Sequence, residues 1–168
     1  MIPNWNDRFA KAWAACGYEG NPVGIEQIQL RANKWVRFHS FPDKQFPANP
    51  ADDKQVFDRF AAVGNALFSR SEEIYYLSPW VAEAEGPDEE PVFRWSVRAT
   101  PWQAMEWKQV LLSTAYDHEM SFGLFSPQSG CFLAPYPGGL DVFENDSVAR
   151  DALATQFRAW LPKNPIRG

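Results

Sequence analysis

Apolar and polar residues alternate along a short segment that begins at Trp35. Val36 and Phe38 alternate there with Arg37 and His39, which is the period of a β-strand. Because successive side chains of a strand point to opposite faces, Trp35, Arg37 and His39 share one face. A guanidinium and an imidazole beside a large aromatic ring can hold an anion, orient a carboxylate, or pair with acidic side chains of a neighbouring strand. The sequence leaves these alternatives open and favours the last, a structural polar cluster.

Apolar residues at helical spacing predict about four helices. The longest follows Asp52 and Asp53, two acids that suit the first turn of a helix. Thr100 and Pro101 predict a further helix start, because a capping hydroxyl precedes a proline at the first helical position. The pattern does not decide whether residues 108–116 form a helix or a strand. This longest helix is expected near residues 52–68, and the other helices near residues 5–16, 23–30 and 148–161.

Further strands are expected in the middle and late parts of the chain. Residues 74–77 and 92–98 are rich in β-forming side chains, and the acidic stretch 83–90 between them predicts a hairpin with a solvated, mobile loop. Later strands are expected at residues 122–125, 131–133 and 140–143. We therefore predict an α+β fold over residues 1–168, a single globular domain with a mostly antiparallel sheet of about five or six strands packed against about four helices.

The composition narrows the classes of function. The chain of 168 residues is 45% apolar and contains eight Trp and thirteen Phe, which indicates a globular protein with aromatic side chains to spare for a groove or an interface. The formal charge of −5 argues against a nucleic-acid partner. No apolar run reaches membrane-spanning length and the N-terminus lacks a secretion signal, so we expect a soluble cytoplasmic protein with no membrane partner. Cys16 and Cys131 are then expected to be buried thiols, not a disulfide.

The sequence contains no compact catalytic motif. Neither a phosphate-cradling glycine loop nor a nucleophile elbow occurs, and the two histidines, His39 and His118, do not combine with the two cysteines at any familiar metal-ligand spacing. Cys131 lies in an apolar strand, where a thiol is typically inert. We therefore expect no metal and no cofactor.

The candidate site is a polar cluster on the predicted sheet. Asp141 alternates with apolar neighbours and so points away from the core that they fill. An aspartate that faces Arg37 and His39 can orient the imidazole for general acid–base catalysis, whereas a salt-bridge network explains the same residues without catalysis and is favoured. The candidate catalytic residues are Arg37, His39 and Asp141, and the candidate binding residues are Trp35, Arg37, His39, Tyr136 and Asp141.

Two segments of the chain resemble a known family. Residues 35–44 are similar to an Arg-Phe-His-Ser-Leu-Pro segment of bacterial proteins that are catalogued as a domain of unknown function. Residues 134–142 resemble a late Gly-x-Asp-Val turn of the same proteins, which is followed by a helix ending in tryptophan. Pro137 stands here in place of that turn's first acidic residue. The family brings no activity with it, but small acidic α+β domains of bacteria are often immunity proteins, so the resemblance implies a binding role.

Two classes of function follow from these observations. The first is a binding module that docks a protein partner, either immunity-like or regulatory, through aromatic and acidic surface. The alternative is an enzyme that acts on a small anionic substrate held by Arg37, with His39 as the general acid or base. The position of His39 separates the two, because a deep pocket shared with Arg37 favours the enzyme and a flat, exposed aromatic patch favours the binding module.

Overall fold

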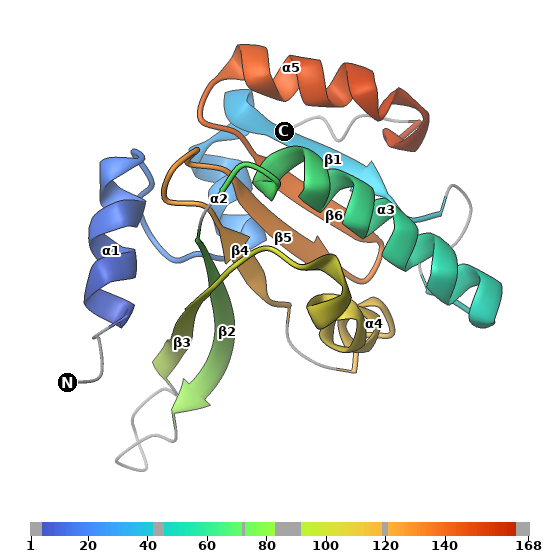
Figure 1. The fold of residues 1–168 in the computed structure, drawn as a ribbon, viewed down its shortest axis with the longest axis horizontal. Helices are drawn as coiled ribbons and strands as arrows, with labels where there is room; N and C mark the ends of the chain where they lie inside the picture. The colour runs from blue at the N-terminus through green and yellow to red at the C-terminus, as the bar shows by residue number, and fades with distance from the viewer. Residues whose placement is uncertain (1–4, 42–45, 72, 83–91, 119–120, 164–168) are drawn as a thin grey trace.

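A computed structural model describes residues 5–41, 46–71, 73–82, 92–118 and 121–163 of the chain. The strands in these parts are β1 (Trp35–His39), β2 (Ile74–Ala82), β3 (Val92–Thr100), β4 (Gly123–Phe125), β5 (Phe132–Tyr136) and β6 (Gly139–Phe143). They form one sheet in the order β1-β6-β5-β4-β2-β3, and every pair of neighbours is antiparallel (Figure 1). The predicted sheet is therefore confirmed.

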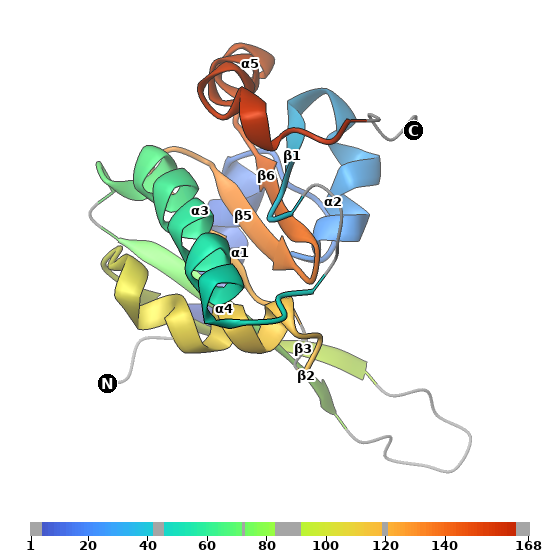
Figure 2. The same ribbon diagram turned by 90° about the vertical axis from the view of Figure 1, so that its right-hand side faces the viewer.

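Helices cover both faces of this sheet. The α-helices of the described residues are α1 (Trp5–Ala15), α2 (Gly24–Leu30), α3 (Pro50–Phe68), α4 (Lys108–Ala115) and α5 (Ser147–Gln156), and single 3₁₀ turns lie at Ala32–Lys34, Ala104–Trp107 and Arg158–Trp160. Helices α3, α4 and α5 pack on one face and α1 and α2 on the other (Figures 1 and 2). This arrangement confirms the predicted α+β class.

The central strands bury apolar side chains on both faces, which period-two alternation alone did not indicate. Phe38 and Val142 pack under Phe60 of α3, whereas Phe132 packs with Trp13 of α1 on the opposite face. Every residue of β6 is buried as a result, including Asp141. The aspartate predicted to point away from the core does so, but it points into a second covered layer.

Helix α3 begins where the sequence provides a cap. The side chain of Asn49 accepts hydrogen bonds from the backbone N–H groups of Ala51 and Asp52, and Pro50 occupies the first turn, where its missing N–H costs nothing. Asp52 and Asp53 lie in the first turn, as predicted, where the helix dipole favours acids. The helix then buries one apolar stripe against the sheet.

The hairpin of β2 and β3 is longer than the rest of the sheet. Strand β4 pairs only with residues 75–77 of β2, so the far part of the hairpin is paired within itself and projects from the sheet (Figure 2). The predicted hairpin is confirmed. The acidic stretch 83–90, predicted to be a mobile loop, lies outside the described residues.

The helix start predicted at Thr100 and Pro101 is wrong. Thr100 is the last residue of β3 and pairs with Ile74, and its hydroxyl donates to the carbonyl oxygen of Pro101 instead of accepting from a helix N–H group. The pairing with β2 outweighs the local capping signal, and helical structure begins only at the 3₁₀ turn that starts at Ala104. Within the undecided range 108–116, Lys108–Ala115 is helical.

The last helix is shorter than the predicted range 148–161. It is capped by Asp146, whose side chain accepts from the N–H of Ala149, and it ends at Gln156. A separate 3₁₀ turn, Arg158–Trp160, follows it. That turn keeps the rings of Phe157 and Trp160 stacked, with centroids 4.7 Å apart.

Candidate functional site

The site begins with the pairing of β1 and β6, strands separated by about a hundred residues of chain. Their register places Arg37 directly opposite Asp141 and His39 opposite Gly139. A Cβ atom at Gly139 would lie 2.0 Å from the carbonyl oxygen of Phe38, so only glycine permits this approach of the two strands. The turn after Tyr136 therefore fixes which side chains face Arg37.

Arg37 and Asp141 form a two-pronged ion pair. Arg37 Nε donates to Asp141 Oδ1 and Arg37 Nη2 donates to Asp141 Oδ2, both at 2.8 Å. Trp35 Nε1 also donates to Asp141 Oδ1, at 2.9 Å. With only 3% of Asp141 exposed, this set of donors is what allows a carboxylate at this depth. The carboxylate oxygens of Asp141 thus accept their hydrogen bonds from Arg37 and Trp35.

Two aromatic rings flank the guanidinium of Arg37. Its Cζ atom lies 4.5 Å from the centroid of the Tyr136 ring and 5.3 Å from that of Trp35. Burial lowers the pKa of Arg37, but the hydrogen bonds and charge of Asp141 outweigh it, so the net shift is upward. Burial raises the pKa of Tyr136, and its hydroxyl is buried without a hydrogen-bond partner among the described residues.

His39 shares the strand face with Arg37 but not its hydrogen bonds. Within the described part of the chain, the imidazole makes no hydrogen bond, and Asp141 does not orient it. Burial, followed by the positive charge of Arg37, lowers the pKa of His39 and so favours the neutral imidazole. The structure therefore unites four of the five candidate residues, Trp35, Arg37, Tyr136 and Asp141, and leaves His39 at the margin.

A pocket of about 250 Å³ opens beside this cluster. Arg37, Asp141 and Tyr136 line one side of it, and His39 does not line it. The lining residues that sequence reasoning missed come from β3, from β5, from the segments just before α2 and β4, and from the first turn of α2. They are mainly apolar: Trp95, Ala134, Pro135, Pro22, Val23, Ile25 and Phe122, with Gly24 and Ser121. No local pattern identifies them, because these segments are distant in the sequence, and Trp95 lies in the part of the hairpin that extends beyond the pairing with β4.

Gly24 sets how closely α2 approaches the floor of the pocket. A Cβ atom there would lie 3.2 Å from Ala134 Cβ and 3.6 Å from Asp141 Oδ2. A side chain at this position would crowd Ala134 and reach Asp141. The helix expected near residues 23–30 therefore forms one wall beside the ion pair.

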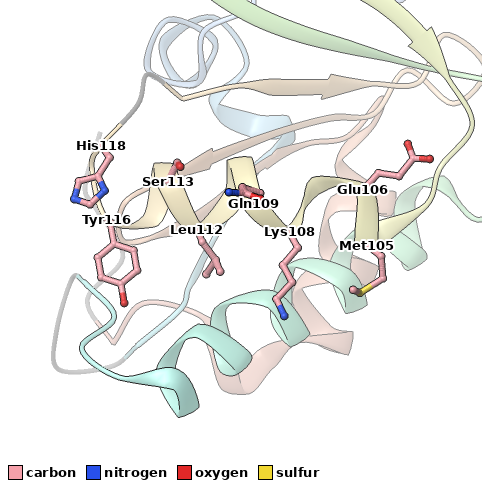
Figure 3. Close-up of a pocket in the computed structure, with 8 residues that line it drawn as sticks. All are labelled: Met105, Glu106, Lys108, Gln109, Leu112, Ser113, Tyr116 and His118. Atoms are coloured by element: carbon pink, nitrogen blue, oxygen red, sulfur yellow. The ribbon is translucent and has the colours of Figure 1, made fainter.

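A second and wider hollow runs along α4 (Figure 3). It has a volume of about 670 Å³ and extends from Met105 to His118. Its polar side chains do not converge on one point: Lys108 and Tyr116 point towards α3, while Ser113 points away from it (Figure 3). The His118 ring stacks on that of Tyr116, with centroids 5.6 Å apart. Tyr116 is already bound to Asp53 Oδ1 at 3.0 Å. This hollow offers less for recognition than the pocket beside Arg37.

The thiols and potential metal ligands do not form a reactive centre in the described residues. Cys16 and Cys131 are both free, and Cys131 Sγ donates to Glu144 Oε2 at 2.8 Å. Burial, followed by the charge of Glu144, raises the pKa of Cys131, which favours an unreactive thiol. No group of three His, Cys, Asp or Glu side chains in the described residues could hold a metal ion.

Comparison with known proteins identifies the family. A family model described as a domain of unknown function, DUF3885, matches residues 77–165, which is more than half of the chain. The chain belongs to the DUF3885 family. No curated protein and no solved structure matches it. The DUF3885 match includes Trp95, Tyr136 and Asp141 but not β1, so the family region supplies most of the pocket and the residues before it supply Arg37.

The match bears out the predicted resemblance to a domain of unknown function, and it covers the segment 134–142 on which part of that resemblance rests. None of the helices in the described parts of this DUF3885 protein has the length and apolarity that a membrane crossing requires.

Proposed function

We propose that this protein is a binding module that docks a protein partner through the pocket between α2, β3 and β5. The observation that carries the proposal is the character of the pocket: aromatic and proline walls surround a floor on which Arg37 and Asp141 neutralise each other. Binding energy in protein interfaces concentrates at such small, well-packed hollows, where an anchor side chain is fully desolvated. The pocket has this form.

The edge of the pocket also supports a protein partner. Ile25, on the first turn of α2, lines the pocket and is 73% exposed. An exposed isoleucine next to an apolar hollow extends the surface that a partner can cover. The formal charge of −5 disfavours an acidic partner and would steer a basic one towards the protein.

The alternative, an enzyme that holds an anionic substrate with Arg37, has less support. Arg37 Nε and Nη2 already face Asp141, which leaves the guanidinium charge compensated. His39, the proposed acid or base, lies outside the pocket lining. A substrate anion would have to compete with a buried carboxylate for the same donors.

We also propose that the protein acts in the cytoplasm of a bacterium as an immunity-like or regulatory protein. Two free thiols, one of them buried against Glu144, suit a reducing compartment. The small size, the acidic charge and the α+β fold are common among immunity proteins, which is support by analogy of fold. The partner is then another protein, with no nucleic acid or membrane involved.

Site-specific photo-crosslinking tests the binding proposal. Ile25 is replaced by p-benzoylphenylalanine and the protein is irradiated in a lysate of its native cells. The matched control is the same replacement at Val148, which is similarly exposed at 77% but lies on α5, on the opposite face of the sheet. We expect a discrete protein adduct from position 25 and not from position 148. The same adducts from both positions, or none from position 25, would contradict the proposal.

A further inference from the structure

Two residues that line the pocket each have a buried polar atom without a hydrogen-bond partner. These atoms are Trp95 Nε1 and the hydroxyl oxygen of Tyr136, and neither finds a partner among the described residues. A buried polar group without a partner costs free energy, and most such groups in folded proteins are satisfied. Two of them around one small hollow therefore require an explanation.

Position distinguishes Trp95 from other tryptophans of the chain. The indole N–H groups of Trp13 and Trp107 are also buried without a partner, but these rings lie within the two apolar cores. Neither lines the pocket, whereas Trp95 does. Of these three indole donors, only that of Trp95 belongs to a residue that lines the pocket.

The charges of the pocket indicate an uncharged occupant. Among the described residues that line it, Arg37 and Asp141 carry charge, and the charges of this bidentate pair cancel each other. A charged group that entered would lose its hydration and find no free counter-charge among these residues, which is costly. The groups still available for recognition are a donor on Trp95, a hydroxyl on Tyr136 and the surrounding apolar surface.

The size of the pocket restricts the occupant further. A cavity of about 150 Å³ is known to accommodate benzene, and pockets for drug-sized ligands begin near 300 Å³. The volume of about 250 Å³ between these limits suits a single aromatic side chain with the amide next to it. A nucleotide or another large cofactor does not fit.

We propose that this pocket accepts one uncharged aromatic side chain from an extended segment of the protein partner, and that Trp95 Nε1 donates to a backbone carbonyl oxygen beside it. The inference rests on the proposed function and names what the partner must present. The Tyr136 hydroxyl then pairs with the polar edge of the same ligand. Both atoms are buried in the free protein, so small side-chain movements accompany binding, as is common at interfaces.

Nuclear magnetic resonance with capped amino acids tests this inference without the partner. N-acetyltryptophanamide is titrated into the whole protein labelled with ¹⁵N, and the backbone amide signals are followed in every variant, together with the indole N–H signal of Trp95 where that residue is present. N-acetyltryptophan, with the same ring and a free carboxylate, tests the requirement for an uncharged ligand, and N-acetylalaninamide tests the requirement for the ring. We expect saturable binding of the tryptophan amide and markedly weaker binding of the other two probes.

Matched variants locate the binding. Trp95→Phe keeps an aromatic wall and removes the donor, so the dissociation constant should rise roughly tenfold, as for one lost hydrogen bond. Trp107→Phe also removes an orphaned indole donor, but outside the pocket, and should leave the constant unchanged. Tyr136→Phe, the smallest change, should weaken binding in the same direction as Trp95→Phe. The amide spectra of the variants report whether each one is folded.

The inference is overturned if the tryptophan amide does not bind, if the carboxylate binds equally well, or if both Trp95→Phe and Tyr136→Phe leave its affinity unchanged. The two proposals fail in different ways. Binding of the amide at Trp95 without a protein adduct at position 25 would contradict the partner and retain the pocket. An adduct at position 25 without amide binding would retain the partner and overturn this account of what the pocket holds.

Discussion

Two tyrosine–arginine stacks lie on the same face of the sheet and differ in what their polar atoms do. Arg31 Cζ lies 3.7 Å from the ring centroid of Tyr18, and Arg37 Cζ lies 4.5 Å from that of Tyr136. In the first stack the Tyr18 hydroxyl donates to the carbonyl oxygen of Gly130 at 2.8 Å. In the second the Tyr136 hydroxyl has no partner among the described residues.

The arginines differ in the kind of partner that they bind. Arg31 donates to neutral backbone carbonyl oxygens, including that of Gly17 at 2.8 Å and that of Glu144 at 3.3 Å, so it ties the loop after α1 to the end of β6. Arg37 is paired with the buried charge of Asp141 and borders the pocket. The first stack has a structural role. The second combines a structural ion pair with a Tyr136 hydroxyl that makes no hydrogen bond within the described residues and is available to a ligand.

The largest difference between the stacks is expected on removal of the arginines. Arg37→Ala leaves the buried Asp141 carboxylate with the Trp35 donor alone, and should lower the free energy of unfolding by about 3–5 kcal/mol. Arg31→Ala leaves only neutral carbonyl groups unpaired, and should cost about 1–3 kcal/mol. Urea denaturation of both variants measures the two losses.

Arg37→Lys is the control for geometry, because lysine keeps the charge and loses the two-pronged bond. It should recover only part of the loss. An Arg37→Ala protein as stable as the wild type would show that Arg37 is a ligand clamp with no structural part, which reverses the present assignment.

A smaller loss of stability is expected from a substitution at Gly138, which packs against the Tyr136 ring of the second stack. A Cβ atom at Gly138 would lie 2.7 Å from Cε2 of the Tyr136 ring, so Gly138→Ala must shift that ring or the turn beside it. We expect a cost of about 1–3 kcal/mol, in the range of overpacked sites, measured by the same denaturation. Retention of full stability would mean that the Tyr136 ring moves freely, and the pocket would then lack a fixed wall.

The second stack should also make stability depend on pH through His39. Burial and the charge of Arg37 lower the pKa of His39 in the folded state, so the unfolded chain takes up a proton first as pH falls. Stability is therefore highest above the unfolded pKa of about 6.5 and declines as pH falls below it towards the folded value. His39→Gln should flatten that decline in melting temperature between about pH 7.5 and pH 5.5. An equal decline in both proteins would assign it to other groups.

Much of the fold could be predicted from local pattern, and the site only in part. Alternation around Arg37 and around Asp141 indicated two strands with polar residues on one face, and this is what brings the ion pair together. The pattern could not show that Asp141 would bind Arg37 and not His39, because the partner of Asp141 depends on the register between distant strands. Trp95 was missed since β3 is separated from β5 by two strands in the sheet, and its place at the same pocket as Tyr136 depends on how the long hairpin extends beyond β4.

Thr100 shows the same limit in a helix prediction. Its hydroxyl and the following proline make a good helix start, yet Thr100 is the last residue of a nine-residue strand that pairs with β2. Local signals were reliable where no competing long-range contact existed, as at Asp52 and Asp53 in the first turn of α3. They failed where strand pairing determined the conformation, as at Thr100.

The most direct test of the contrast is to remove one oxygen atom from each stack and compare the stabilities. Tyr18→Phe deletes a buried hydroxyl that donates to Gly130, and should lower the free energy of unfolding by about 1–2 kcal/mol. Tyr136→Phe deletes a buried hydroxyl without a partner, and should leave stability unchanged or raise it slightly. Equal losses in the two variants would show that the Tyr136 hydroxyl is a structural group, and would contradict the claim that this face holds unused polar atoms for a ligand.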